Sequence, residues 1–383
     1  MAIENEIFCD VAIIGGGPAG CSAGIRLAER GSNVIIIDKK KFPRDKICGG
    51  LITQKAMDLL RDELRINDLS SVIESESNSF GLYERNQLIN KASTNEYTYC
   101  VTRNNFDYFL VKKASSIGCN VLDGIIVKNI HNSDKYLVAG NNKINYKYLI
   151  AADGVNSKAG MIINETLDKD LLAIGLQIEI PLSRIVNTGD WSYPKIYFGY
   201  VQYGWGWVFP KKDHVTVGLA GLMTDGLELR KRFKRLTGEI KCVQSIDDLP
   251  INGGIIPYGT FIKMPAKDGV FLTGDAAGFA EPITGEGIYY ALKSGLLAAE
   301  VILSNSRNKE NQYCILCNKY IINDLKQAKI ARKFLFNQPF HSIAMKKLRK
   351  STKHMVSFMR ILSGEIDYKT FFCEIIKRKL GLK

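Results

Sequence analysis

A glycine-rich segment between a buried strand and a helix constrains the fold more than any other feature of this sequence. Residues 9–15 form an apolar run, residues 18–30 follow a helical pattern, and residues 33–38 form a second apolar run that ends on Asp38. Between the first run and the helix, residues 15–20 read Gly-Gly-Gly-Pro-Ala-Gly and match GxGxxG. This order predicts a parallel βαβ unit of the dinucleotide-binding type.

Each small residue of this motif has a physical reason to be there. Gly15 permits the tight turn, Gly17 lets the backbone approach a pyrophosphate, and Gly20 lets the helix pack closely on the strand. The helix N-terminus directs unpaired N–H groups at the phosphates, and Asp38 is placed to accept hydrogen bonds from ribose hydroxyls. We therefore expect Gly15, Gly17, Ala19, Gly20 and Asp38 to bind a dinucleotide. The alternative is a glycine turn with a structural role only.

The net charge of +13 is concentrated at the C-terminal end of the chain. Residues 307–383 contain 18 lysines and arginines against five acidic residues, and the rest of the chain is balanced. This distribution argues against a nucleic-acid-binding body and predicts a basic C-terminal surface. Apolar residues recur there at helical spacing among the basic ones: Met345, Leu348, Met355, Met359 and Leu362.

This apolar stripe has two interpretations. A basic amphipathic helix can lie on anionic lipid, which would give the protein a peripheral contact with the inner face of a membrane. Alternatively, the stripe packs on the body of the protein and the charges are solvated.

The cysteines and histidines give no sign of a disulfide framework or a metal site. The nine cysteines are scattered, which predicts reduced thiols in a cytoplasmic protein. Cys314 and Cys317 form a single CxxC without a second pair, and the four histidines share no ligand spacing. We expect no metal.

A second glycine-rich segment indicates which dinucleotide is bound. Residues 271–278, Phe-Leu-Thr-Gly-Asp-Ala-Ala-Gly, resemble the second FAD fingerprint of the hydroxylase-like flavoprotein superfamily. The resemblance implies that Asp275 binds the ribityl chain and that Pro282 lies beside the isoalloxazine. It also implies that the amides of Gly287 and Ile288 face the pyrimidine edge, where a helix N-terminus would stabilise a reduced, anionic flavin. The FAD contacts it implies outside the first motif are Cys48, Gly49, Arg103, Val127, Asp275, Pro282, Gly285, Gly287 and Ile288.

The order of the expected strands and helices along the chain predicts an α/β fold with interleaved domains. Residues 171–221 are rich in strands and aromatic residues, as in an antiparallel sheet, and a buried strand returns at 269–275. We expect residues 1–165 and 256–305 to form a Rossmann-type FAD-binding domain. Residues 166–255 should form a β-rich substrate domain with an antiparallel sheet, and residues 306–383 a basic helical C-terminal segment.

Three further segments resemble the geranylgeranyl reductase family. Residues 42–50, Phe-Pro-Arg-Asp-Lys-Ile-Cys-Gly-Gly, are similar to its PRxKxCGG stretch. Residues 204–210, Gly-Trp-Gly-Trp-Val-Phe-Pro, are similar to its YxWxFP motif, with Trp205 in place of the tyrosine, and residues 364–368 look like its C-terminal segment. The resemblance implies an FAD-dependent enzyme that reduces carbon–carbon double bonds of an isoprenoid, geranylgeranyl-type substrate, often lipid-linked.

Two alternatives remain open from the sequence. Trp205 also makes the segment similar to the WxWxIP motif of flavin-dependent halogenases, so a halogenase or monooxygenase acting on a small aromatic substrate is the second hypothesis. A non-catalytic flavin sensor is the third. Residues 152–157, Ala-Asp-Gly-Val-Asn-Ser, resemble the DG motif of aromatic hydroxylases, but Gly160 stands where that motif usually has an arginine. The electron donor therefore stays open between NAD(P)H and a ferredoxin.

Four residues are candidates for contact with an apolar small-molecule or lipid substrate. Cys48 is either a catalytic thiol beside the reacting carbon or a small residue needed for packing. Trp205 and Trp207 alternate with glycines on one strand, so both rings should project to one face and form an apolar wall. Tyr203 joins that face only if the strand is regular.

Overall fold

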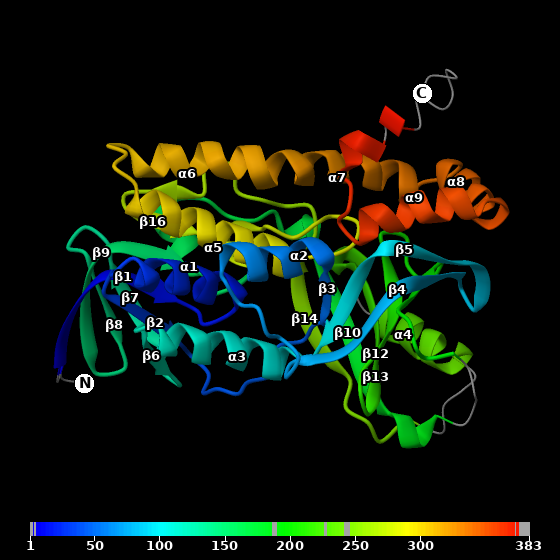
Figure 1. Ribbon diagram of the computed structural model, residues 1–383, viewed down its shortest axis with the longest axis horizontal. Helices are drawn as coiled ribbons and strands as arrows, with labels where there is room; N and C mark the ends of the chain where they lie inside the picture. The colour runs from blue at the N-terminus through cyan, green and yellow to red at the C-terminus, as the bar shows by residue number, and fades with distance from the viewer. Residues whose placement is uncertain are drawn as a thin grey trace.

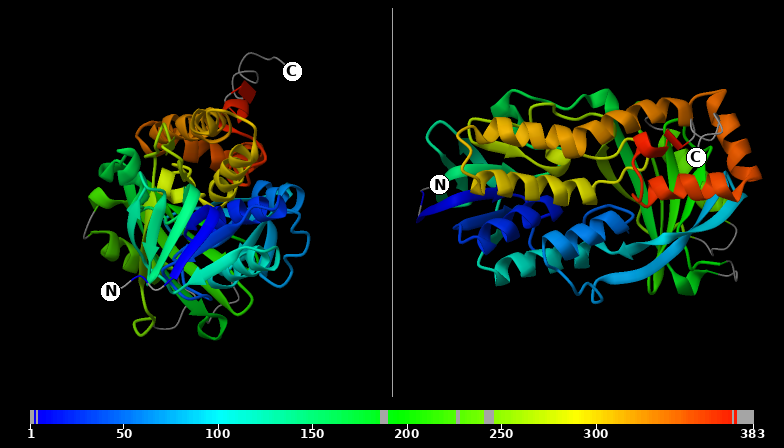
Figure 2. Two further views of the ribbon diagram at one scale, coloured as in Figure 1. Left: turned by 90° about the vertical axis from the view of Figure 1, so that its left-hand side faces the viewer. Right: turned by 45° about the horizontal axis from the view of Figure 1, so that its top comes forward.

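The computed structural model describes residues 3, 5–185, 190–225, 228–240, 246–371 and 373–374. The molecule is elongated, with the N-terminal βαβ layer at one end and the last helices running along one side toward the other end (Figure 1, Figure 2). Two sheets form its centre, and the predicted α/β architecture is confirmed.

The first sheet has the order β15-β16-β9-β1-β2-β6, and β7 and β8 extend it from β9. Its strands are β1 (Asn5–Ile14), β2 (Val34–Asp38), β6 (Asn120–Asp123), β7 (Val127–His131), β8 (Tyr136–Ala139), β9 (Asn142–Ala151), β15 (Ala266–Lys267) and β16 (Val270–Leu272). The strands β16, β9, β1, β2 and β6 run parallel. Every residue of β2 is buried, as expected for a parallel strand covered on both faces.

Helices cover this sheet and extend along the molecule. They are α1 (Pro18–Glu29), α3 (Arg103–Ser116), α5 (Ile288–Leu303) and α6 (Lys309–Cys317). The helix α1 begins at the predicted proline, and α5 begins two residues after Glu286, where the sequence suggested a helix start.

The second sheet has the order β14-β10-β13-β12-β11-β4-β5-β3. Its strands are β3 (Leu51–Thr53), β4 (Ile73–Glu84), β5 (Gln87–Val101), β10 (Leu172–Pro181), β11 (Lys195–Phe198), β12 (Gly204–Pro210), β13 (His214–Leu222) and β14 (Asn252–Pro257). The helix α4 (Glu228–Glu239) packs Phe233 and Leu236 under it.

The strands β3, β4 and β5 of this sheet come from residues 51–101, which were predicted to belong to the FAD-binding domain. Within residues 51–101, β4 and β5 form a long antiparallel hairpin, and β4 pairs with β11. The second sheet therefore includes strands from outside residues 166–255, the range predicted for the substrate domain. The pattern of apolar and polar residues within a strand does not indicate which sheet the strand joins.

Short helices and turns complete the chain. They are α2 (Gln54–Asp58), η1 (Leu59–Glu63), η2 (Ala159–Ile163), η3 (Lys169–Leu171), η4 (Leu182–Arg184), η5 (Met223–Asp225), η6 (Gly274–Ala277) and η7 (Asn318–Ile322). All eight cysteines in the described ranges are free thiols.

The C-terminal helices are α7 (Asn323–Phe336), α8 (Phe340–Lys350) and α9 (Thr352–Leu362). The helices α8 and α9 pack on the β4–β5 hairpin, and α7 joins the same apolar cluster. The apolar stripe of the sequence analysis faces inward here: Met345, Leu348, Met355 and Met359 are all buried. The side chain of the fifth member, Leu362, lies outside the described residues. The interpretation of this stripe as a lipid-facing surface is therefore wrong, because the hairpin covers it. None of the helices in the described part of the chain combines the length and the apolarity that spanning a membrane requires.

Candidate active site

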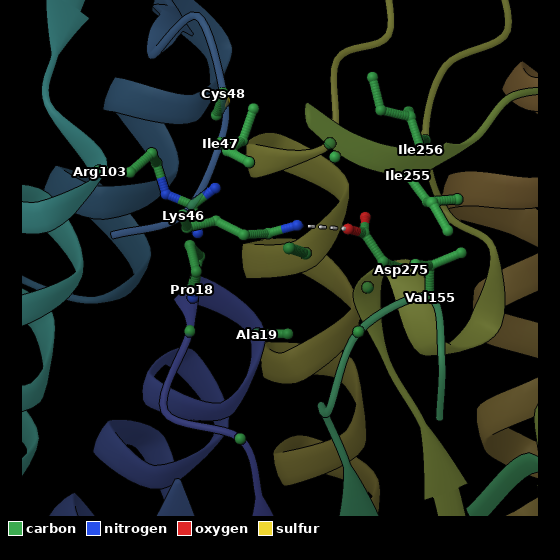
Figure 3. Close-up of a pocket in the computed structure, with 18 of the residues that line it drawn as sticks. Pro18, Ala19, Lys46, Ile47, Cys48, Arg103, Val155, Ile255, Ile256 and Asp275 are labelled. Atoms are coloured by element: carbon green, nitrogen blue, oxygen red, sulfur yellow. Dashed lines mark ion pairs between the residues drawn. The ribbon is translucent and has the colours of Figure 1, made fainter. Parts of the chain in front are cut away.

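A cavity of about 1200 Å³ lies where the two sheets approach each other. It begins at the carboxyl ends of β1 and β2, passes the N-termini of α1 and α5, and ends against the aromatic face of β12. Figure 3 shows part of this cavity, with Pro18 and Ala19 of α1 on one side and Asp275 on the other. Ligand sites of α/β proteins are expected at the carboxyl ends of parallel strands.

The glycines of the turn after β1 are packed tightly against the protein, except for Gly17, which faces the cavity. A β-carbon at Gly15, whose φ is +105°, would lie 2.2 Å from the carbonyl oxygen of Ala152. A β-carbon at Gly20 would lie 1.9 Å from the carbonyl oxygen of Gly15. At Gly17 the nearest atom to such a carbon is a guanidinium nitrogen of Arg44, 3.7 Å away. The first two glycines allow close packing, and Gly17 leaves space above the helix N-terminus.

Two helix N-termini point at the same cavity. Gly17 precedes α1 and Gly287 precedes α5, and both residues line the cavity. As glycines, they have no side chain that could cap the helix N–H groups. The two helices touch closely, because a β-carbon at Gly295 would lie 2.1 Å from the carbonyl oxygen of Ala19. The combined partial positive charge suits an anionic ligand such as a pyrophosphate.

Asp38 is held by a buried network of alternating charges. Its Oδ2 accepts hydrogen bonds from the backbone N–H of Gly16 at 2.9 Å and from Nε of Arg44 at 3.2 Å. Arg44 also pairs with Asp107 at 3.1 Å, and Arg103 donates to the same carboxylate at 2.7 and 2.8 Å. Burial opposes the charge of Arg103, but the Asp107 carboxylate outweighs it and raises the pKa of the guanidinium. The network fixes both arginines at the cavity wall.

Asp275 faces the cavity from η6, directly below the N-terminus of α5. The ammonium group of Lys46 reaches toward it from the opposite wall, with 3.6 Å between Nζ and the carboxylate (Figure 3). Asp275 also lies beside Gly287, where a β-carbon would be 3.4 Å from its Oδ1. The carboxylate is therefore at the middle of the cavity, with a basic partner across it.

The loop before α5 is braced from the C-terminal part of the chain. The buried carboxylate of Glu281 accepts hydrogen bonds from the N–H of Ile283 at 2.9 Å and the hydroxyl of Thr284 at 2.6 Å. Its other oxygen accepts from the hydroxyl of Tyr368 at 2.7 Å. Burial raises the pKa of Glu281, and these donors oppose that effect.

A second set of contacts holds the carbonyl oxygen of Ile283. Trp205 donates its indole N–H to it at 2.8 Å, and the hydroxyl of Tyr258 donates at 3.0 Å. Arg332 of α7 donates to the carbonyl oxygen of Tyr258 at 2.5 Å and lies over its ring. Elements from three parts of the chain thus fix this loop.

The far wall of the cavity is an aromatic ladder on β12. Ring centroids are 5.7 Å apart for Trp205 and Trp207, and 6.2 Å apart for Trp207 and Phe209. Gly218 faces Trp207 on the next strand, and a β-carbon there would lie 2.1 Å from the indole. The glycine lets the indole lie flat over the sheet.

This apolar wall contains two polar atoms without a protein partner. The indole Nε1 of Trp207 and the Oε1 of Gln177 are both buried and form no hydrogen bond in the described structure. Both residues line the cavity and stand opposite Gly218, in one row across the sheet. Buried polar atoms normally have partners, so a ligand or water is expected to contact this pair.

Cys48 lies on the loop that closes the cavity above this wall. Its side chain is half-buried, lines the cavity and accepts a contact from the N–H of Gly50 at 3.4 Å. The neighbouring Gly49 has no space for a side chain, because a β-carbon would lie 2.7 Å from the ring of Phe209. The buried ammonium group of Lys211 donates to the carbonyl oxygens of Gly49 and Val101 at 2.9 and 2.7 Å.

Most of the predicted site residues meet at this one cavity. Its lining includes Gly15, Gly17, Ala19, Asp38, Cys48, Gly49, Arg103, Val127, Trp205, Trp207, Asp275, Gly285, Gly287 and Ile288. Gly20 and Pro282 are buried behind it. Tyr203 does not line it, because its ring lies beside Phe336 and its hydroxyl donates to Asn337 at 2.7 Å. Tyr203 precedes β12, so the strand alternation that would have carried it to the cavity does not extend that far.

Among the wall residues that were not singled out from the sequence are Arg44, Lys46 and Gln177. Arg44 and Lys46 lie in the segment that resembles PRxKxCGG, but no role was assigned to them. Gln177 shares the cavity side of β10 with Gly175, while Leu176 and Ile178 face the core on the other side. A glutamine that alternates with apolar residues in a buried strand was the available signal.

The chemistry of the cavity fits FAD. The space over Gly17 and the two helix N-termini suit the pyrophosphate, Asp38 lies at the adenosine end, and Asp275 lies midway along the cavity. The braced loop from Glu281 to Gly287 and the aromatic wall border the remaining space.

Comparisons with known proteins agree with this cavity. The sequence model of an FAD-binding domain family matches residues 8–191. An uncharacterised protein of Methanosarcina barkeri is 37% identical over 338 residues, which are 85% of this chain and 84% of that one. The menaquinone reductase of Mycobacterium tuberculosis is 27% identical and covers 79% of this chain and 78% of its own length. The chloroplastic geranylgeranyl diphosphate reductase of Arabidopsis thaliana is 29% identical, with 78% and 66% covered.

Solved structures share the whole fold. A geranylgeranyl bacteriochlorophyll reductase-like protein of Thermoplasma acidophilum has a TM-score of 0.81 at 23% identity, covering 97% of this chain and 100% of that one. A flavin-dependent brominase has a TM-score of 0.67 at 21% identity, covering 89% and 93%. These structures show the fold. The sequence relatives show that the chain belongs to the geranylgeranyl reductase family of FAD-dependent oxidoreductases.

Proposed function

We propose that this enzyme reduces carbon–carbon double bonds in the isoprenoid chain of a geranylgeranyl-type, lipid-linked substrate. The observation that carries the proposal is the shared cavity: the FAD-binding features and the aromatic wall of β12 border one continuous space. Relatives named as reductases of geranylgeranyl diphosphate, digeranylgeranylglycerophospholipid and menaquinone support this substrate class.

We assign the FAD contacts by position along the cavity. Asp38 binds the adenosine ribose, the N-termini of α1 and α5 bind the phosphates and the pyrimidine edge, and Asp275 binds the ribityl chain. Bound FAD, once reduced, supplies a hydride to one carbon of the double bond. The protein orients the substrate chain against Trp205 and Trp207 and excludes water from the reacting carbons.

Cys48 is the group we assign to the proton that completes the reduction. Its half-buried thiol lines the cavity on the loop above the aromatic ladder. Replacement of Cys48 by alanine should lower the rate of reduction by about 10²-fold, the usual contribution of a positioned acid. Unchanged turnover with normal flavin content would assign the thiol to packing alone.

The reaction class is tested with chemically reduced enzyme under anaerobic conditions. The enzyme should saturate a polyprenyl lipid without oxygen, and free reduced FAD without the protein is the control. If turnover requires oxygen, with or without halide, the halogenase or monooxygenase alternative replaces this proposal. Flavin reduction without any product would favour the sensor.

The electron donor is tested by anaerobic flavin bleaching. We propose that NAD(P)H or a reduced ferredoxin reduces the bound flavin. Addition of each donor separately, followed at the flavin absorbance band, identifies which one reacts. Bleaching by neither would remove both from consideration.

A further inference from the structure

The outer face of α7 and α8 carries an exposed apolar cluster that the catalytic site does not use. Ile330 and Phe334 are 57% and 49% exposed, and Phe340 and Ile343 are 49% and 48% exposed. The rings of Phe334 and Phe340 touch across the turn between the helices, with centroids 5.2 Å apart. We call these four side chains the α7–α8 face. They form one continuous patch, because the members within each helix are three or four residues apart.

This face is the opposite side of helices that pack inward, α7 through Ala328 and Phe336 and α8 through Met345 and Leu348. It lies at the end of the molecule away from the N-terminus (Figure 1, Figure 2). Exposed lysines surround it, among them Lys326, Lys333 and Lys347. Large apolar side chains clustered on a surface mark an interaction site more often than isolated ones do.

The charge of this region indicates what the face contacts. Residues 325–364 contain ten lysines and arginines and no aspartate or glutamate. An isologous contact with a second copy would bring lysines against lysines, which is unfavourable. Anionic headgroups over buried acyl chains complement both the lysines and the four apolar side chains.

We propose that the α7–α8 face docks the protein onto an anionic lipid surface. Ile330, Phe334, Phe340 and Ile343 enter the boundary between headgroups and acyl chains, and the surrounding lysines contact the headgroups. The buried side of α7 reaches the catalytic cavity through Arg332 and Tyr258. The helix α7 therefore lies between the α7–α8 face and the wall of the cavity. This inference does not depend on which molecule the enzyme reduces.

The test is co-sedimentation of the full-length flavoprotein with phosphatidylcholine vesicles, with and without phosphatidylglycerol, at low and high salt. We expect binding that requires the anionic lipid and weakens with salt. Phe334→Ser with Phe340→Ser should reduce the partition coefficient by about tenfold, and Lys333→Glu with Lys347→Glu by about tenfold or more.

Matched controls change the same residue types elsewhere on the surface. Phe8→Ser with Ile126→Ser removes exposed apolar side chains near the N-terminal end, and Lys112→Glu with Lys234→Glu makes the same change in net charge. These variants should bind vesicles within about twofold of the wild type. Flavin content and thermal melting of all variants verify the fold.

Three outcomes would overturn the proposal. The wild type could ignore anionic vesicles at low salt, or the control pairs could lose as much binding as the α7–α8 pairs. The third is a concentration-dependent dimer, seen by analytical ultracentrifugation, that the Phe334→Ser and Phe340→Ser changes abolish. That result would make a second copy of the chain the partner of this face.

Discussion

Asp275 shows how one carboxylate can organise a cofactor site. It is partly exposed to the cavity, next to a helix N-terminus and opposite the ammonium group of Lys46. A flavin bound along the cavity would replace part of the solvent around this acid. Replacing Asp275 by a neutral residue would remove a hydrogen-bond acceptor for the ligand and leave the ammonium group of Lys46 without this carboxylate as its partner.

We predict that Asp275→Ala lowers FAD affinity by at least about tenfold, the cost of one hydrogen bond to a charged group. Titration of apo-protein with FAD, followed by flavin fluorescence, measures the change. Asp62→Ala, which removes an exposed acid that does not line the cavity, is the control. A variant that retains wild-type flavin would contradict the assignment of Asp275.

His214 at the start of β13 makes fold stability depend on pH. Its hydrogen bond to Glu179 raises its pKa, burial opposes this, and a second hydrogen bond to Asp213 adds to the increase. The folded-state pKa therefore lies above the ordinary value of about 6.5, and the protonated form is stabilised. This contribution is fully present below about pH 6.5 and is lost as the pH rises through the raised folded-state pKa.

Thermal melting measured across this range should show the effect. We predict that the wild type loses up to about 1 kcal/mol between pH 6 and pH 9, since Glu179 is partly exposed and the pair is screened. His214→Gln should show a flatter profile over the same range. Equal slopes for the two proteins would refute the role of His214.

At the scale of elements, the site depends on how closely α1 and α5 approach each other. Gly295 lies in the contact, and any side chain there would collide with the backbone of Ala19. The N-termini of both helices line the cavity, so a change in their separation alters the cradle for FAD.

Gly295→Ala should therefore destabilise the protein by about 2 kcal/mol or more and weaken FAD binding. Gly238→Ala on α4 is the matched control, because nothing lies within 4 Å of a β-carbon at that position. That substitution should be neutral or stabilising by up to about 1 kcal/mol, since alanine is the better helix former. Chemical unfolding of both variants tests the pair.

The loop before α5 depends on an element from the far end of the chain. Tyr368 donates to Glu281, whose carboxylate also holds the backbone of the loop. Tyr368→Phe should cost about 1–2 kcal/mol of stability by leaving a buried carboxylate oxygen without a donor.

The same variant should shift the absorbance and the reduction potential of the bound flavin, which a purely structural role would not change. A double-mutant cycle with Glu281→Gln should show coupling of about 0.5 kcal/mol or more. Tyr97→Phe, at an exposed tyrosine, is the control. Additive effects in the cycle would mean that the hydrogen bond does not hold the loop.

At the scale of the whole molecule, the C-terminal helices complete the core. The hydroxyl of the fully buried Tyr313 donates to the carbonyl oxygen of Leu272 at 2.8 Å. Met355 and Met359 of α9 are completely buried against the second sheet. The basic segment is therefore an integral part of the body.

We predict a single thermal transition in which the C-terminal helices unfold together with the two sheets. A chain ending at Asn308 should lack flavin and unfold without a cooperative transition. Calorimetry and flavin absorbance of the two chains provide the measurement. A separate, earlier transition of residues 309–362 in the full-length protein would contradict this expectation.

The amino-acid sequence by itself determined the local features of this protein. The βαβ unit, the acid at the end of β2 and the aromatic strand β12 were all visible, because glycine spacing and alternation reflect the geometry of single elements. The family was visible for the same reason, since its motifs are short and contiguous. Most of the expected wall residues also follow from these motifs, because strand ends and helix N-termini meet at one edge of a sheet.

Only the tertiary structure decided which elements meet. The β4–β5 hairpin joins the second sheet, Asp107 links two arginines at the wall, and Gln177 comes to lie in one row with Trp207. The stripe through Met345 and Met359 is buried, while Phe334 and Phe340 are exposed. An amphipathic pattern states that a helix has an apolar face, but the element that covers this face is set by contacts between residues far apart in the chain.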